Sequence, residues 1–143
     1  MSLSLNSILL VDDDEISHLF NKIFIGKLNL NVDLDFALNG KEALHLLAPA
    51  NGSSTILLPC LVLLDVNMPV MGGWEFLKAY VEEVHPDTRK KVTIVMLTTS
   101  ADEADMIKVM NNPHVKEYVK KPLSEEAIRQ LIGKYFPNTK IDN

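Results

Sequence analysis

The stretch LVLLDVNMPVMGG, residues 61–73, contains a complete transition from a strand to a helix. Residues 61–64 form a continuous apolar run, which is typical of a strand buried on both faces of a sheet. Asp65 follows directly, and residues 68–73 are rich in turn-forming side chains. Apolar residues then recur at helical spacing until Pro86 ends the helix, at Trp74, Leu77, Tyr80, Val81 and Val84. A buried strand, a loop and a helix in this order predict an α/β unit.

Four more short segments have the character of strands. Residues 7–11 (SILLV) and 92–97 (VTIVML) are mostly apolar, as expected of strands that are covered on both faces. Residues 32–36 (VDLDF) alternate between apolar and acidic side chains, which predicts a strand with one solvated face. Residues 115–119 form a short fifth strand.

Helical spacing and capping residues predict a helix after each strand. After the first strand, apolar residues recur at helical spacing as far as Gly26, at Ile16, Leu19, Phe20, Ile23 and Phe24. Asn39 and Ser124 are N-cap residues of two further helices. Ser100 and Glu103 have the spacing of a capping box.

Five strands that alternate with five helices predict a parallel sheet covered by helices on both faces. The 143 residues contain no internal repeat and no linker, so we expect a single domain over residues 1–143, with its core at about residues 6–137. In such sheets, ligands bind beyond the carboxyl ends of the strands, where the strand order reverses.

Polar side chains gather at these predicted strand ends. Three acids at residues 12–14 follow the first strand, Asp65 follows the third, TTS at residues 98–100 follows the fourth, and KKP at residues 120–122 follows the fifth. Crowded carboxylates favour protonation of one another unless a cation joins them. Oxygen ligands without His or Cys select Mg²⁺, Mn²⁺ or Ca²⁺. A lysine and a hydroxyl on the same edge suit the outer oxygens of a phosphoryl group.

Composition excludes several other classes of protein. With 14 basic and 19 acidic side chains, the formal net charge is −5, so binding to nucleic acid, which needs clustered Lys and Arg, is not expected. A single cysteine, Cys60, excludes an internal disulfide and a zinc site built from several cysteines. No apolar run approaches the ~20 residues of a membrane span, and the start lacks the basic flank of a signal peptide. We expect a cytoplasmic protein with no membrane partner.

Five short stretches occur in an order that matches a known family. They are ILLVDD at residues 8–13, NGKEAL at 39–44, LVLLDVNMPVMGG at 61–73, IVMLTTS at 94–100 and YVKKPL at 118–123. Together they resemble the receiver domain of two-component response regulators across nearly the whole chain. The resemblance implies a flavodoxin-like, doubly wound five-stranded parallel sheet with strand order 2-1-3-4-5.

The resemblance also implies a metal site. Asp65 is similar to the phosphoacceptor of the family, which also contacts the metal. Asp12 and Asp13 resemble the acidic pair that holds Mg²⁺, with Mn²⁺ or Ca²⁺ as alternatives, and Asp13 is expected to be the more direct ligand. The backbone carbonyl of Asn67 would complete the protein ligands.

Three further residues resemble the parts of the family that respond to phosphorylation. Thr98 is similar to the hydroxyl that engages the phosphoryl group, and Thr99 is the alternative for this role. Lys121 is similar to the lysine that contacts the phosphoryl group, and it precedes Pro122, whose peptide bond is usually cis in the family. Tyr118 stands at the aromatic switch position.

The function implied by the resemblance is a stand-alone phosphorylation switch, which is not an enzyme. A sensor histidine kinase or a histidine-phosphotransfer protein would donate a phosphoryl group to Asp65, and the output would be a contact with an unidentified protein target. Onward transfer of the phosphoryl group in a phosphorelay is the alternative. The sequence does not separate these two outcomes.

Two positions in the sequence bear on other classes of protein, an enzyme and a cofactor-binding domain. An aspartate-nucleophile phosphatase usually carries a second acid two residues after its nucleophile, where this chain has Asn67. A flavin- or nucleotide-binding domain needs a loop that cradles phosphate after the first strand, where this chain has the acids of residues 12–14. Both observations disfavour these classes.

Other polar residues have simpler interpretations. Asp14 and Glu15 are expected to be helix-start acids, which the helix dipole stabilises. Gly72 stands where the family often has Asp, and Trp74 is hypothesised to lie close enough to Asp65 to report on it. The four histidines lack ligand spacing and are expected at the surface or in packing: His18, His45, His85 and His114.

Overall fold

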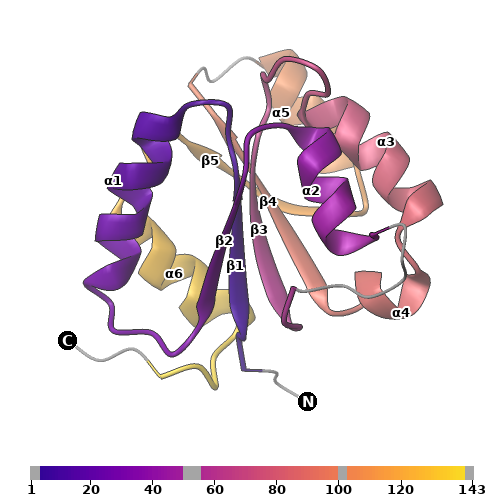
Figure 1. Cartoon of the computed structure of the whole chain (residues 1–143). Coiled ribbons are helices and arrows are strands. Elements are labelled where there is room, and N and C mark those ends of the chain that lie inside the picture. The colour runs from indigo at the N-terminus through magenta and orange to yellow at the C-terminus, as the bar shows by residue number, and fades with distance from the viewer. Residues whose placement is uncertain (1–3, 50–55, 100–102, 141–143) are drawn as a thin grey trace.

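A computed structural model describes residues 4–49, 56–99 and 103–140. Five strands form one parallel sheet in the order β2-β1-β3-β4-β5 (Figure 1). The strands are β1 (Ser7–Val11), β2 (Asp33–Ala37), β3 (Cys60–Asp65), β4 (Val92–Thr98) and β5 (Val115–Lys120). The predicted doubly wound parallel sheet and its strand order are therefore confirmed.

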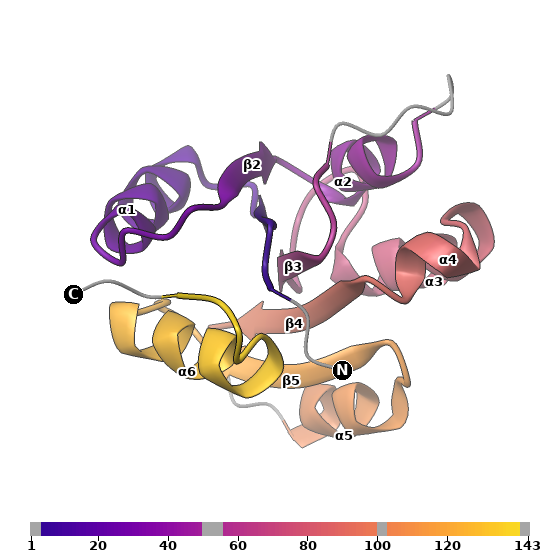
Figure 2. The same cartoon turned by 90° about the horizontal axis from the view of Figure 1, so that it is seen from below.

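Helices cover both faces of this sheet. One face carries α1 (Glu15–Gly26) and α6 (Glu125–Tyr135), as the view from below shows (Figure 2). The other face carries α2 (Gly40–Leu47), α3 (Gly73–Glu83) and α5 (Glu103–Asn111). Among the described residues, no helix has the length and apolar character that crossing a membrane requires.

Alternate strand residues supply two separate cores. On β1, Ile8 and Leu10 pack with the core beneath α1 and α6, whereas Leu9 and Val11 pack with the core beneath α2, α3 and α5. All four side chains are almost completely buried. Burial of an aliphatic side chain stabilises a fold by about 1.5–3 kcal/mol, so the continuous apolar runs hold the sheet in the middle of the domain.

The predicted caps agree with the structure wherever they are described. The Asn39 side chain accepts a hydrogen bond of 2.9 Å from the Glu42 N–H, and the Ser124 side chain accepts one of 3.1 Å from the Ala127 N–H. The expected cap at Ser100 lies outside the described residues.

The predicted number of helices was too low by one within the described residues. The helix after β3 ends at Glu83, before Pro86, and Pro86 begins a short additional helix, α4 (Pro86–Arg89). Proline suits the first position of a helix because its missing N–H would have no partner there. The His85 ring caps this turn, since its Nδ1 accepts a 3.1 Å hydrogen bond from the Asp87 N–H.

The orientation of α1 differs from what its sequence pattern suggests. Its apolar stripe faces solvent, with Ile16, Leu19, Phe20 and Ile23 exposed. The side of α1 that faces the sheet buries two polar residues and one apolar residue, which are His18, Asn21 and Ile25. The polar His18 is accommodated there because its ring bonds to main-chain oxygen atoms at the ends of β1 and β2.

Gly73 allows α3 to begin directly against the end of β3. A Cβ atom at this position would lie 2.7 Å from the Asp65 carbonyl oxygen and 2.8 Å from Met96 Cε. The Gly73 N–H also donates a 2.9 Å hydrogen bond to the Val66 carbonyl. Only glycine therefore permits the loop after Asp65 to pack this closely.

We predict that Gly73→Ala lowers the free energy of unfolding by about 1–3 kcal/mol, because the added methyl group meets backbone atoms that cannot move away. The matched control is Gly26→Ala at the end of α1, where a Cβ would meet nothing within 4 Å. This control should raise the free energy of unfolding by about 0.5–1 kcal/mol. Urea titrations of both variants test the difference, and equal effects would contradict it.

Candidate functional site

The carboxyl ends of β1 and β3 lie side by side at the point where the strand order reverses. Val11 pairs with Leu64 in the β1–β3 register, so Asp12 and Asp65 follow on neighbouring strands at the same level of the sheet. Ligand sites of doubly wound sheets occur at this position. The topology thus brings together residues that are more than 50 positions apart in the chain.

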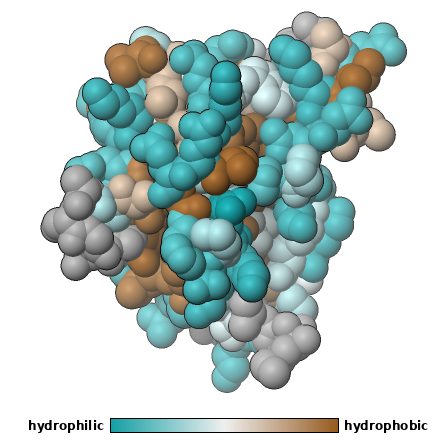
Figure 3. All heavy atoms as spheres, turned by 90° about the vertical axis from the view of Figure 1, so that its right-hand side faces the viewer, coloured by the Kyte–Doolittle hydropathy of each residue, from teal (hydrophilic) through white to brown (hydrophobic). Residues whose placement is uncertain are grey.

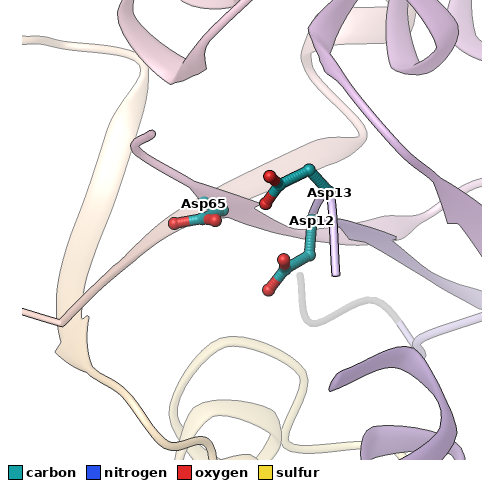
Figure 4. A group of neighbouring side chains, drawn as sticks. All are labelled: Asp12, Asp13 and Asp65. Atoms are coloured by element: carbon teal, nitrogen blue, oxygen red, sulfur yellow. The ribbon is translucent and has the colours of Figure 1, made fainter. Parts of the chain in front are cut away.

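Three carboxylates meet at this edge. One oxygen atom from each of Asp12, Asp13 and Asp65 lies within 4.8 Å of the other two, and Figure 4 shows the three side chains converging from the two strand ends. Asp12 and Asp65 are only 3% and 8% exposed, whereas Asp13 is open to solvent. The cluster is therefore partly buried, and its Asp13 side is accessible to solvent.

Lys121 brings a positive charge into this cluster from the end of β5. Its Nζ atom lies 2.7 Å from Asp12 Oδ2 and 3.6 Å from Asp65 Oδ2. Its backbone N–H donates a 2.6 Å hydrogen bond to the carbonyl of Thr98 at the end of β4. The peptide bond to Pro122 is cis, as the family resemblance implied.

The charges of the cluster are not balanced, and a further cation would reduce its negative charge. Burial raises the pKa of Asp65, and the charges of Asp12 and Asp13 add to this effect, while Lys121 and the N–H of Asn67 oppose it. Burial alone would lower the pKa of Lys121, but its bonds to Asp12 and Asp65 outweigh burial and raise it. With all groups ionised, three carboxylates and one ammonium group carry a formal charge of −2.

This donor set fits a divalent cation that prefers oxygen. Carboxylate oxygens without nitrogen or sulfur are the ligands of Mg²⁺, Mn²⁺ and Ca²⁺, and the remaining charge of the cluster equals that of one such ion with opposite sign. Asn67 lines the same hollow as Asp13, next to the open side of the cluster. Trp74 lines this hollow too, in agreement with the hypothesis that it lies near the site.

Asp14 does not belong to the cluster. Its side chain accepts hydrogen bonds from the Ile16 N–H at 2.9 Å and from Ser17 Oγ at 3.0 Å, so it caps α1 as expected. These bonds to the helix lower the pKa of Asp14. Its backbone N–H donates a 2.9 Å bond to Asp12 Oδ1, which helps to orient the buried carboxylate.

The two neighbouring threonines have different surroundings. Asp65 pairs with Leu97 in the β3–β4 register, so Thr98 lies one residue beyond Asp65 and is buried at the end of β4. Thr99 is exposed and lines the groove beside α1 that also contains Lys121 and Pro122. This difference supports Thr98 rather than Thr99 as the hydroxyl near Asp65.

Tyr118 lies on β5, away from the carboxylates. It pairs with Met96 of β4 and is half-buried against the core beneath α3 and α5. The register places it two residues before Lys120, the partner of Thr98. Tyr118 therefore belongs to the strand that carries Lys121 into the site.

His18 supports the site in a way that the sequence analysis missed. Its Nε2 lies 2.8 Å from the Asp12 carbonyl and 3.2 Å from the Ala37 carbonyl. Both partners are acceptors, so Nε2 carries the proton and donates to them. The ring therefore ties the end of β1 to the end of β2 and fixes the backbone of Asp12. The available signal was that His18 stands on the side of its helix opposite the apolar stripe.

Comparison with known proteins gives consistent matches. A family model described as the response regulator receiver domain matches residues 8–133. The chain is 30% identical over 125 residues to the probable methanogenesis regulatory protein FilR2 of Methanothrix harundinacea, covering 87% of this chain and 77% of that protein. It is 29% identical over 132 residues to hybrid signal transduction histidine kinase G of Dictyostelium discoideum, covering 92% of this chain but only 4% of the kinase.

Solved structures share the fold. A two-component response regulator from Cytophaga hutchinsonii is 27% identical with a TM-score of 0.75, and the match covers 94% of this chain and 99% of that one. The Mn²⁺-bound form of response regulator Rcp1 is 23% identical with a TM-score of 0.73, covering 96% and 99% of the two chains. The family match spans the three clustered acids and the five strands apart from Ser7, the first residue of β1. The chain therefore belongs to the response regulator receiver domains of two-component systems.

Proposed function

We propose that this chain is a phosphoacceptor switch in which Asp65 takes a phosphoryl group from a phosphohistidine on a sensor histidine kinase or a histidine-phosphotransfer protein. The observation that carries the proposal is the meeting of three carboxylates and Lys121 at the strand edge of a receiver domain. Asp65 is the acid at the end of β3, central in the sheet, and its carboxylate lies near both the acidic pair and the Lys121 ammonium group, which is 3.6 Å away.

We propose that Mg²⁺ is the resident cation and that Asp12, Asp13, Asp65 and the backbone carbonyl of Asn67 would hold it. Mg²⁺ takes few carboxylates, keeps several waters and also binds phosphate oxygens. When bound, it would supply positive charge to the transferred phosphoryl group. The response regulator Rcp1, which has the same fold, has been solved with Mn²⁺, which supports a divalent ion of this kind.

The transfer exchanges one bond to phosphorus for another. A carboxylate oxygen of Asp65 forms the new O–P bond while the N–P bond of the phosphohistidine breaks, and the imidazole nitrogen keeps the electron pair. The product is an acyl phosphate, which water can hydrolyse. Positioning and charge neutralisation supply the catalysis of such a step. In this chain, the Lys121 ammonium group and the Thr98 hydroxyl are suited to the outer phosphoryl oxygens.

The output is proposed to be a change of the surface around β5. Phosphorylation adds about −1.5 to −2 charges and strong acceptor oxygens at Asp65. The Thr98 hydroxyl moves towards these oxygens, and the Tyr118 ring turns into the space that is vacated. This change alters the face formed by α5, β5 and α6, where a protein target binds. Onward transfer of the phosphoryl group uses the same site.

We propose that residues 1–143 form one receiver domain with its core at about residues 6–137 and that it regulates rather than turns over substrates. The family match to residues 8–133 and a single sheet with helices on both faces support this extent. The histidine donors of these systems receive their phosphoryl group from ATP. We therefore also propose that the chain acts in the cytoplasm.

The acceptor assignment predicts the outcome of phosphorylation by a small acyl phosphate such as acetyl phosphate in the presence of Mg²⁺. The natural chain should gain the mass of one phosphoryl group, and Asp65→Asn should gain none, because the amide is not a nucleophile. The control is Asp33→Asn, which changes an exposed acid on β2 and should leave the mass gain intact. A mass gain that persists in Asp65→Asn would refute the site.

Lys121 is predicted to serve phosphoryl transfer and signalling rather than metal binding. In Lys121→Ala, Mg²⁺ affinity should be retained, since the ammonium group competes with the ion for Asp12. Phosphorylation should slow by on the order of 10²-fold, the usual effect of losing one group that stabilises transferred charge. Titration of the Trp74 fluorescence measures the ion, and mass spectrometry over time measures the transfer. Lys120→Ala, at the exposed neighbouring lysine, is the control, and a loss of Mg²⁺ affinity in Lys121→Ala would contradict this division of roles.

The raised pKa of Asp65 predicts how metal-free stability depends on pH. Because the folded-state pKa lies above the ordinary value of about 3.9, the folded protein binds the proton more tightly than the unfolded chain does. Stability therefore falls as pH rises through the window between these two values. Asp65→Asn removes this ionisation, so it should be more stable than the natural chain at pH 7 in EDTA.

Urea titrations from pH 4 to pH 7 check this prediction. The advantage of Asp65→Asn should shrink towards pH 4, where more of the natural carboxyl is protonated than at pH 7, and it should shrink again when Mg²⁺ is added at pH 7. Glu82→Gln, at an exposed acid on α3, should show no such pattern. If the natural chain is more stable than Asp65→Asn at pH 7 without metal, the buried Asp65 carboxylate does not lower the free energy of unfolding, and the prediction is wrong.

A further inference from the structure

The outward side of α1 carries an apolar surface that the phosphorylation site does not use. Ile16, Leu19, Phe20 and Ile23 are 64%, 59%, 54% and 47% exposed, and they occupy two successive turns of one helix. We call these four residues the α1 outer face. Contiguous apolar surfaces of this kind mark sites of protein association, whereas single exposed apolar residues are ordinary.

On the opposite side of the molecule, charged side chains interrupt the exposed apolar ones, which are Val81, Met106, Ile107 and Met110. On the face at the right of Figure 1, hydrophobic side chains lie in patches that hydrophilic ones interrupt (Figure 3). There, the groove between α3 and α5 is bordered by Lys78 and Lys108. The ammonium group of Lys108 lies 5.5 Å from the centre of the Trp74 ring and so covers part of this aromatic side chain.

The spacing of the α1 outer face is that of a seam between two helices. Its residues stand at positions i, i+3, i+4 and i+7, which is the pattern that brings one helix into contact with another along its length. The sheet does not use this pattern, since it contacts the side of α1 that carries His18, Asn21 and Ile25. The strongest apolar periodicity of the helix is therefore directed away from its own domain.

The charges along α1 are divided between its ends. Asp14 and Glu15 are exposed at its beginning, and Lys22 and Lys27 are exposed towards its end. Two such helices repel each other when they run parallel, because like charges then lie together. They attract each other when they run antiparallel, because acids then meet lysines.

Glu15 and Lys22 make this complementarity specific. They are seven residues apart, so they lie on the same flank of the outer face. In an antiparallel pair centred between Leu19 and Phe20, Glu15 of one copy is level with Phe24 of the second, about 3 Å along the helix axis from Lys22. The long side chains of Glu15 and Lys22 span this offset, and the two-fold axis repeats the contact. We propose that the α1 outer face binds the same face of a second copy of this chain, with the two α1 helices antiparallel across a two-fold axis.

This dimer is expected to be weak and reversible. A single pair of helices buries less than the roughly 1,200 Å² of a stable complex, so we expect a dissociation constant in the weak range, between about 1 µM and 1 mM. Phe20 also lines the groove that contains Lys121 and Pro122. A second copy on α1 therefore lies next to the phosphorylation site without taking part in it, and it limits approach to Asp65 from that side.

Analytical ultracentrifugation of the full chain, from about 10 µM to about 1 mM, tests the proposal. The average mass should rise from the 16.0 kDa of one chain towards twice that value. Leu19→Gln should remain monomeric over this range, because it removes the centre of the outer face at an exposed position that folding does not need. The matched control is Met110→Gln on α5, at an 82% exposed methionine, which should associate like the natural chain.

Charge reversal tests the antiparallel arrangement. Glu15→Lys and Lys22→Glu should each weaken the dimer by about threefold to tenfold, because each creates two like-charge contacts. The double variant should recover the natural affinity, since its contacts are again of opposite sign. Circular dichroism melts confirm that each variant is folded.

Several outcomes would overturn the proposal. A natural chain that stays monomeric at about 1 mM excludes the dimer, and a double charge variant that is as weak as the single variants excludes the antiparallel pairing. A third contrary outcome is a Leu19→Gln variant that shows the same average mass as the natural chain at every concentration, but slower phosphorylation by a phosphohistidine protein and normal phosphorylation by acetyl phosphate. This result would show that the α1 outer face binds the phosphoryl donor and not a second copy. Asp65→Asn should dimerise normally, so failure of the acceptor assignment and failure of this proposal are distinguishable.

Discussion

Repulsion among Asp12, Asp13 and Asp65, and its partial relief by Lys121, is the interaction on which the functional edge depends. Two of these acids are nearly buried, where a carboxylate loses hydration, and one lysine cannot neutralise three of them. The burial that raises the pKa of Asp65 also makes the site responsive to added positive charge. The same imbalance that costs stability without a metal favours a divalent ion, whose positive charge a phosphoryl group would need at this edge.

Main-chain contacts around the site hold this unfavourable arrangement in place. The β1–β3 register sets Asp12 beside Asp65, and the close approach at Gly73 packs the following loop against β3. His18 ties the end of β1 to β2 through the Asp12 carbonyl. Because these contacts use backbone atoms, the carboxylates keep their positions although they repel one another. Rigid neighbours of this kind are what positioning catalysis requires.

Helix α1 serves two surfaces with opposite chemistry. Its inward side is polar where His18 reaches the strand ends, and its outward side is apolar at Ile16, Leu19 and Ile23. The usual arrangement of a surface helix is the reverse. The inward polar contact supports the geometry of Asp12, and the outward apolar surface is exposed to solvent. The same helix therefore contributes to the acidic site and carries the surface proposed to bind a second copy.

The amino-acid sequence alone determined the five strands, the helix that follows each of them and the residues of the acidic edge, but not the short helix α4. Apolar runs and caps such as Asn39 and Ser124 act locally, and parallel strands bring their carboxyl ends together whatever the details of packing. Tertiary structure alone decided which side of α1 faces the sheet, that His18 bonds to Asp12, and that Lys121 lies closer to Asp12 than to Asp65. Each of these depends on atoms brought together from distant parts of the chain, and periodicity shows that a helix has an apolar side without showing what that side meets.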